Sequence, residues 1–77
     1  MRARAKIMND MVFFYIPSPF SDIYRPGDIV GVMVNGKLIA GKVITRGRAK
    51  FVVVSKKFAG VIKEGEEYEI KKYRLDV

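Results

Sequence analysis

The stretch that decides the fold is FFYIPSPFSDIYRPGDIVGV, residues 13–32, because a stretch of the same pattern follows 38 positions later. This second stretch is FVVVSKKFAGVIKEGEEYEI, residues 51–70, and the two align without a gap. The identical pairs are Phe13 with Phe51, Phe20 with Phe58, and Gly27 with Gly65. Most other aligned positions keep their apolar, basic or acidic class. An internal match of this kind indicates a fold made of two similar units. We therefore predict an internal duplication, with repeats 1–34 and 37–73 joined by a turn at Asn35–Gly36.

Strand signals occur on both sides of each stretch. Basic residues alternate with Ala3, Ala5 and Ile7 between residues 2 and 8, which is the period of a half-buried strand. The apolar run at residues 12–16 is rich in residues that favour strands. We predict six strands, which in chain order cover residues 2–8, 12–16, 29–34, 37–45, 51–55 and 66–72.

Turn signals connect these strands. Asn35–Gly36 is the strongest hairpin signal, and Asn9–Asp10 and Gly47–Arg48 occupy equivalent tight turns in the two halves. Ser18 before Pro19 has the chemistry of a helix start, so we predict a short docked helix in residues 18–24 and a second in 56–62. The predicted fold class is mainly β: a closed six-stranded barrel with two short helices, ordered strand, strand, helix, strand, twice. Closure of the barrel removes exposed strand edges.

Two segments resemble a known family. IPSPFSDIYRPGDIVGVMV (16–34) and VSKKFAGVIKEGEEYEI (54–70) resemble the glycine-aspartate box of the cradle-loop barrels, which include AbrB-type regulators, double-psi barrels and RIFT barrels. Gly27–Asp28 matches the box, whereas Gly65–Glu66 departs from it by one methylene. The resemblance implies that the side-chain bond of the box is altered in the second half. GVIKEGEEYEI (60–70) is also similar to the RIFT-type second domain of translational GTPases.

The resemblance also carries expectations about assembly and function. AbrB-type proteins carry one half-barrel per chain and dimerise, whereas this chain carries both halves. It therefore resembles the small single-chain archaeal RIFT barrels, and the resemblance implies a monomer. The family includes DNA binders, translation-factor domains and a CTP-dependent riboflavin kinase, so it informs fold more than function.

Composition excludes several kinds of site. The 77 residues include no cysteine and no histidine, which excludes disulfides, zinc–thiolate sites and histidine acid-base catalysis. Ser18, Ser21 and Ser55 consequently have no histidine partner for a serine triad. A chain of this length has little room for a deep cavity. We predict a single domain, 1–77, with no enzymatic activity, no cofactor and no metal.

Location is predicted from the same composition. The apolar run at residues 11–16 is far too short for a secretory signal or a membrane span. The abundance of Lys, Arg, Glu, Val and Ile is typical of a thermophile protein. We therefore expect a soluble cytoplasmic protein that does not bind membranes.

Two motifs have structural explanations. Residues 31–37 spell G-x-x-x-x-G-K, but Leu38 stands where a phosphate-binding loop needs Ser or Thr, so we interpret them as a hairpin. Asp28 is the best candidate for acid-base chemistry. However, Asp at a strand start after Gly commonly accepts hydrogen bonds from nearby amides, so we predict a structural role.

The aromatic residues divide into two groups. Four phenylalanines occupy equivalent positions in the repeats, as a symmetric core predicts: Phe13, Phe20, Phe51 and Phe58. The others are less constrained: Phe14, Tyr15, Tyr24, Tyr68 and Tyr73. Any of these that is exposed on a basic face is a candidate for stacking on a nucleobase.

The distribution of charged residues is the feature of the sequence that indicates a function. The net charge is +7, and no acidic residue occurs between Ile29 and Lys63, while acids gather at residues 64–69. The candidate nucleic-acid-binding residues are Lys42, Arg46, Arg48, Lys50, Lys56 and Lys57, with Arg2, Arg4 and Lys6 as additions from the first strand. The equivalent turns of the first half are not basic, which predicts one binding face. A surface of solvated charges that serves only solubility is the alternative.

The leading functional hypothesis is a nucleic-acid-binding module, such as a DNA-binding regulator or a chromatin protein. The alternative is a protein-interaction or adaptor barrel related to translation-factor domains, and an enzyme ranks third. The expected partners are therefore nucleic acid, in the first place DNA, or a protein.

Overall fold

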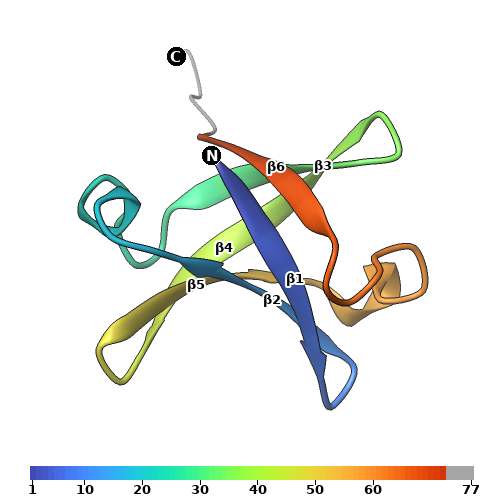
Figure 1. The fold of residues 1–77 in the computed structure, drawn as a ribbon, viewed down its shortest axis with the longest axis horizontal. Helices are drawn as coiled ribbons and strands as arrows, with labels where there is room; N and C mark the ends of the chain where they lie inside the picture. Colours follow the sequence, from blue (N-terminus) through green and yellow to red (C-terminus); the bar gives the residue numbers. More distant parts are fainter. Residues whose placement is uncertain (73–77) are drawn as a thin grey trace.

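The computed structural model describes residues 1–72, which form a closed antiparallel barrel of six strands (Figure 1). The strands are β1 (Arg2–Met8), β2 (Met11–Ile16), β3 (Ile29–Val34), β4 (Lys37–Arg46), β5 (Ala49–Val54) and β6 (Glu67–Lys72). Their order around the barrel is β1-β2-β5-β4-β3-β6, and pairing of β6 with β1 closes it. The prediction of a closed six-stranded barrel is confirmed. Every strand has two partners, so no edge is left open.

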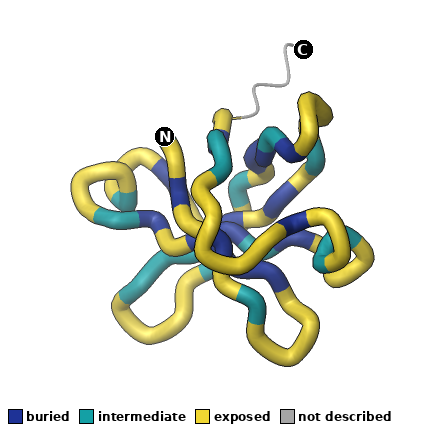
Figure 2. The backbone as a smooth tube through the Cα atoms, turned by 45° about the vertical axis from the view of Figure 1, so that its right-hand side comes forward, coloured by how far each residue is buried: buried dark blue, intermediate teal, exposed yellow. Residues whose placement is uncertain are grey.

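The core fills the barrel interior with every second side chain of the strands. Val12, Phe14 and Ile16 of β2 are buried, and Val52 and Val54 of β5 face them. Figure 2 shows the buried positions gathered at the centre and the exposed positions at the turns. The interior is entirely apolar, since no buried polar or charged residue occurs in the described chain. Within the same residues, no helix is long and apolar enough to cross a bilayer.

The predicted hairpin turns are confirmed. Asn9 and Asp10 both have positive φ, at 51° and 64°, and so do Asn35 and Gly36, at 51° and 78°. Two central residues with positive φ define the type I′ turn, whose twist matches that of the strands. At the β4–β5 turn only Gly47 has positive φ, at 63°, as in a type II′ turn.

The two predicted helices are wrong. Residues 18–24 and 56–62 contain only single 3₁₀ turns, η1 (Phe20–Asp22) and η2 (Lys56–Phe58). Each turn has three residues, too few to offset the cost of starting a helix. Pro19, not Ser18, is the N-cap residue of η1, and no side chain caps the turn. Ser55 does cap η2, because its hydroxyl accepts a hydrogen bond from the Lys57 amide at 3.5 Å.

The core residues of these turn segments differ from the prediction. Phe20 is 40% exposed, and Phe58 only partly packs against the core. The residues that anchor the two segments are Tyr24 and Ile62, which are both buried and lie 38 positions apart. The backbone around the two phenylalanines is nevertheless equivalent. The Phe20 carbonyl accepts hydrogen bonds from the amides of Ile23 and Tyr24 at 3.0 and 3.3 Å, and the Phe58 carbonyl accepts from those of Val61 and Ile62 at 3.1 and 3.2 Å.

The 38-residue spacing of the sequence match recurs in the backbone hydrogen bonds. The Gly27 amide donates to the Val43 carbonyl at 2.7 Å, and the Gly65 amide donates to the Ala5 carbonyl at 2.9 Å. Val43 and Ala5 are themselves 38 positions apart. Cross-strand partners repeat the spacing, with Phe14 opposite Val52 and Val32 opposite Ile70. Tyr73, the predicted end of the second repeat, lies outside the described residues.

Asp28 has the structural role that was predicted. Its carboxylate accepts a hydrogen bond from the Arg25 amide at 2.9 Å. At the equivalent place in the second half, the Lys63 amide donates to the hydroxyl of Tyr68 at 2.9 Å, and that hydroxyl lies 3.5 Å from the Glu66 carboxylate. The expectation of an altered bond beside Gly65 is therefore confirmed.

Candidate nucleic-acid interface

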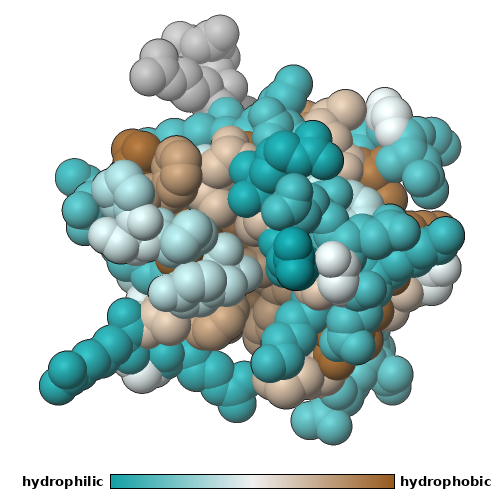
Figure 3. Space-filling model, in the orientation of Figure 1, coloured by the Kyte–Doolittle hydropathy of each residue, from teal (hydrophilic) through white to brown (hydrophobic). Residues whose placement is uncertain are grey.

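Four neighbouring strands, β1, β2, β5 and β4, present one continuous outer face. Because Val12, Phe14 and Ile16 point inward, their neighbours on β2 point outward. The cross-strand register places Lys6 opposite Phe13, Phe13 opposite Val53, and Val53 opposite Lys42. The outward-pointing residues of these four strands, including this row, are called the outer face from here on. In the view of Figure 1, apolar surface is exposed between hydrophilic side chains over the lower half of the barrel (Figure 3).

Five of the six predicted basic residues lie exposed along the β4–β5 hairpin and η2. Lys42 and Arg46 are on β4, Arg48 is in the turn, and Lys56 and Lys57 are in η2. None of the five forms a salt bridge within residues 1–72. Arg2 and Arg4 differ, because both lie within 4 Å of the Glu67 carboxylate, at 3.8 and 3.9 Å. The five unpaired cations are called the basic track below.

The basic track runs along the length of β5. Arg48 precedes this strand, Lys56 follows it, and Lys42 lies opposite Val53 near its end. The eight steps along the chain from Arg48 to Lys56 span about 26 Å at ~3.3 Å per residue. That length corresponds to about seven or eight base pairs of duplex at ~3.4 Å each. A nucleic acid can therefore contact both ends of the track at once.

Lys50 does not belong to the basic track. Its ammonium donates hydrogen bonds to the Ser21 carbonyl and, at 2.9 Å, to the Tyr24 carbonyl. Lys50 is two residues from Val52 and four from Val54, so its side chain starts on the inner side of β5, like theirs. Its hydrogen bonds hold the η1 segment against the end of the barrel. Counting residues from the valines predicts this position, whereas the charge pattern alone does not.

Two basic residues of the track have defined surroundings at η2. The Lys57 ammonium lies 5.1 Å from the centroid of the Phe58 ring, within range of a cation–π interaction. Lys56 and Lys42 line a shallow depression, and its apolar lining includes Met11, Ile44 and Val53. The apolar members of this lining were missed from the sequence, although their outward strand parity identifies them.

Phe13 and Phe51 lie on the outer face. Phe13 is buried, at 6% exposure, but it is not part of the interior cluster, and Phe51 is half-buried. The interior position belongs to Phe14, whose ring meets that of Tyr68 edge-on at 5.9 Å. The prediction of a symmetric phenylalanine core is therefore wrong in its placement. Adjacent residues of a strand point to opposite sides, so Phe13 and Phe14 cannot both face inward.

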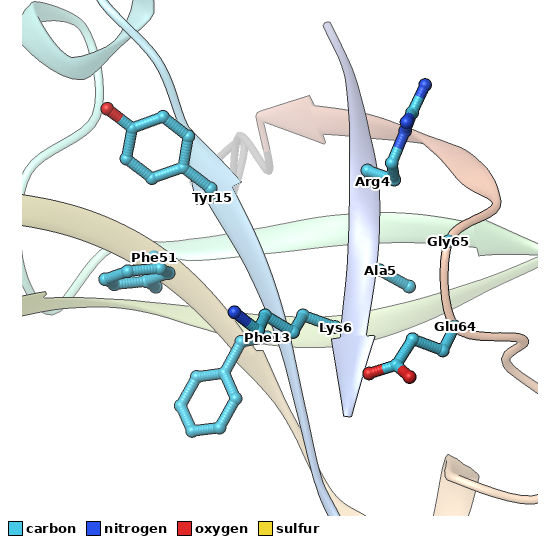
Figure 4. A pocket seen from close by; sticks show the side chains of 8 residues that line it. All are labelled: Arg4, Ala5, Lys6, Phe13, Tyr15, Phe51, Glu64 and Gly65. Atoms are coloured by element: carbon cyan, nitrogen blue, oxygen red, sulfur yellow. The ribbon is translucent and has the colours of Figure 1, made fainter. Parts of the chain in front are cut away.

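Two outer aromatic rings, those of Phe13 and Tyr15, contact the ring of Phe51. Phe13 and Phe51 are 6.1 Å apart between ring centroids, and Tyr15 and Phe51 are 5.7 Å apart. They line a second shallow depression together with Arg4 and Lys6, as Figure 4 shows. In that view, Lys6 extends from β1 toward Phe13. Phe13, Tyr15 and Phe51 are called the aromatic strip below.

Acidic residues gather on the opposite side of the barrel. Glu66 precedes β6, and Glu67 and Glu69 lie on it, three strands away from β5 in either direction. Burial, and the nearby charge of Glu69, raise the pKa of Tyr24 above its ordinary value of 10. Glu64 is the acidic residue nearest the aromatic strip, and its carboxylate accepts a hydrogen bond from the Ile7 amide at 2.9 Å. The carboxylates of β6 thus lie on the far side of the barrel from β5, although β6 also carries Lys71 and Lys72.

Comparison of the chain with protein-family models, with curated proteins and with solved structures found no match. Small barrels support many unrelated functions, so the fold by itself does not assign one. The chemistry of the basic track and the aromatic strip carries the functional argument.

Proposed function

We propose that the protein binds nucleic acid, with the basic track contacting phosphates. The observation that carries this proposal is that Lys42, Arg46, Arg48, Lys56 and Lys57 are exposed along the β4–β5 hairpin and η2 and have no acidic partner within residues 1–72. Cations that are already neutralised by carboxylates release fewer counterions on binding a polyanion. Because the five residues of the basic track are not paired, each can release counterions when it binds a phosphate.

The hairpin tip suits phosphate binding. Arg46 ends β4, and Gly47 and Arg48 form the two-residue turn that follows it and projects from the barrel (Figure 1). The guanidinium group donates paired hydrogen bonds that match the geometry of a phosphate. Contacts to phosphates position a ligand without reading its sequence. We therefore expect binding with little sequence preference, as in a chromatin protein, and the role of DNA-binding regulator requires base contacts in addition.

We also propose that the barrel is of the cradle-loop, RIFT-type class and arose by duplication of one half-barrel. The recurrence of hydrogen bonds at a spacing of 38 residues, at Gly27 and at Gly65, supports this proposal. The glycine-aspartate box at residues 27–28 supports it as well. Both halves are in one chain and the barrel has no open edge, which supports a monomer.

A protein-interaction module is the second candidate function. The observation that favours it is the exposure of Ile29 and Leu38 on neighbouring strands β3 and β4. These side chains lie next to the basic track and have no role in phosphate binding. This candidate takes first place if nucleic acid does not bind.

The test is the salt dependence of affinity, measured by fluorescence anisotropy with a labelled duplex and a labelled single strand. Five phosphate contacts predict a slope of log affinity against log salt of about −4.5 for the duplex and about −3.5 for the single strand, at ~0.9 and ~0.7 per phosphate. Replacing Arg46 and Arg48 by Ala should reduce the slope by about 1.4 to 1.8. The free energy of unfolding should change by less than about 0.5 kcal/mol, since both side chains are exposed.

The matched control removes the same charge from the opposite side of the barrel. Lys63→Ala with Lys71→Ala lowers the net charge by the same two units at the turn before β6 and on β6. This pair should leave the slope unchanged. Equal effects of the two double variants would show that only total charge matters, and absence of salt-dependent binding at low ionic strength would refute the proposal.

A further inference from the structure

The aromatic strip is the feature of the outer face that phosphate binding leaves unexplained. Cross-strand aromatic contacts stabilise a sheet, and Phe13, which is nearly inaccessible, has that role. Tyr15 is different, because it is 53% exposed although its ring contacts Phe51. Held against Phe51 on a rigid strand, the Tyr15 ring presents an apolar surface to solvent.

The surroundings of the strip are those of a site for an anion that also has flat apolar groups. Lys6 shares the depression with the three rings, and Lys42 and Lys56 line the adjoining depression. Arg4 also lines the first depression, but its guanidinium lies 3.9 Å from the Glu67 carboxylate. One carboxylate, that of Glu64, lies at the rim, and its hydrogen bond to the Ile7 amide directs it to the backbone of β1. Positive charge therefore borders the aromatic strip on both sides.

Other exposed apolar residues lack this combination. Those on β3, β4 and the loops are aliphatic: Ile23, Ile29, Leu38 and Val61. Aliphatic side chains do not provide the flat π surface on which bases stack. Phe20, the other exposed aromatic residue of the described chain, lies in η1 and not on a strand of the outer face.

We infer that the aromatic strip stacks unpaired nucleobases through its exposed ring, that of Tyr15, so that the preferred ligand is single-stranded nucleic acid whose phosphates lie on the basic track. This inference rests on the proposed function and adds the class of ligand and the residues that select it. Base stacking on aromatic side chains tolerates any sequence, because every base has a π face. Bases in a duplex are already stacked and paired, so they reach an aromatic ring only after they are unstacked.

The test uses short oligothymidylate and a duplex with the same number of phosphates. Tyr15→Ala should weaken oligothymidylate binding at least fivefold and leave duplex binding unchanged, while Tyr15→Phe should bind both as the wild type does. Circular dichroism and thermal unfolding establish that the variants are folded. Because the chain has no tryptophan, the Tyr15→Trp variant supplies a single reporter whose fluorescence should be quenched on binding.

The outcomes separate this inference from the proposed function. If Tyr15→Ala binds oligothymidylate as tightly as the wild type, or the Tyr15→Trp fluorescence is unchanged at saturation, the inference is wrong and binding through phosphates stands. If no nucleic acid binds at low salt, both are wrong. Analytical ultracentrifugation provides a further outcome. If the wild type is a dimer and Tyr15→Ala is a monomer, the aromatic strip is the interface between two copies of the chain, and the inference is wrong.

Discussion

At the residue scale, strand parity decides what a basic side chain does. Lys42 and Lys50 are both on the β4–β5 hairpin, and the charge pattern predicts the same role for them. Lys42 points outward and has no partner within residues 1–72, whereas Lys50 donates to two carbonyls of the η1 segment. Parity relative to Val52 and Val54 separates the two cases, because those valines mark the inner side of β5. The carbonyls that Lys50 meets belong to a loop, whose path no local pattern specifies.

We therefore predict opposite effects for one substitution at the two lysines. Lys50→Met should lower the free energy of unfolding by about 1.5 to 3 kcal/mol, because two carbonyls lose a charged donor. It should leave the salt dependence of nucleic-acid binding unchanged. Lys42→Met should reduce that dependence and leave stability within about 0.5 kcal/mol. Urea unfolding and anisotropy titrations measure the two quantities. Equal losses of affinity from both variants would contradict the assignment of Lys50.

At the scale of elements, hairpins and strands could be predicted because their determinants are local. Asn9–Asp10 and Asn35–Gly36 adopt the positive φ values that Asn, Asp and Gly tolerate. The helices could not be predicted correctly, because a three-residue turn is stabilised by docking on the barrel and not by its own sequence. The outward placement of Phe13 was equally inaccessible. Three consecutive aromatic residues, 13–15, leave open which of them faces inward until the barrel fixes the register.

Close packing of β4 against β5 gives a prediction at this scale. A Cβ added to Gly41 would lie 2.6 Å from a methyl group of Val52 inside the barrel, where a branched side chain has little freedom. Gly41→Ala should therefore lower the free energy of unfolding by about 1 to 3 kcal/mol. The control is Gly31→Ala, whose Cβ would also lie 2.6 Å from a neighbour, but that neighbour is the exposed side chain of Leu38.

Leu38 can rotate into solvent, so Gly31→Ala should change stability by less than about 1 kcal/mol. Thermal or urea unfolding of the two variants measures the difference. Similar losses in both would show that backbone conformation, and not the space inside the barrel, requires glycine at residue 41.

At the scale of the whole molecule, the internal repeat indicated more about strand pairing than any local sequence pattern did. Pairing of β1 with β6 and of β2 with β5 joins residues far apart in the chain, and propensity does not specify such pairs. The internal match at 38 residues anticipates partners such as Phe14 and Val52. Part of the charge distribution could also be predicted from the sequence, because acidic residues gather at positions 64–69 and basic residues between positions 37 and 57. Only the barrel order shows that β5 and β6 lie on opposite sides.

Chemical-shift mapping by NMR tests most directly whether the outer face is the binding surface. Titration of the ¹⁵N-labelled protein with oligothymidylate at low salt should shift backbone amides of β2, β5 and β4, the turn at Gly47 and the η2 segment, together with residues 4–6 of β1. The chemical shifts of amides in β3 and β6 should change little, because β6 is the acidic strand and β3 lies beside it. Shifts concentrated on β3 and β6, or a spectrum unchanged at saturating oligonucleotide, would contradict the assignment of the basic track and the aromatic strip as the nucleic-acid interface.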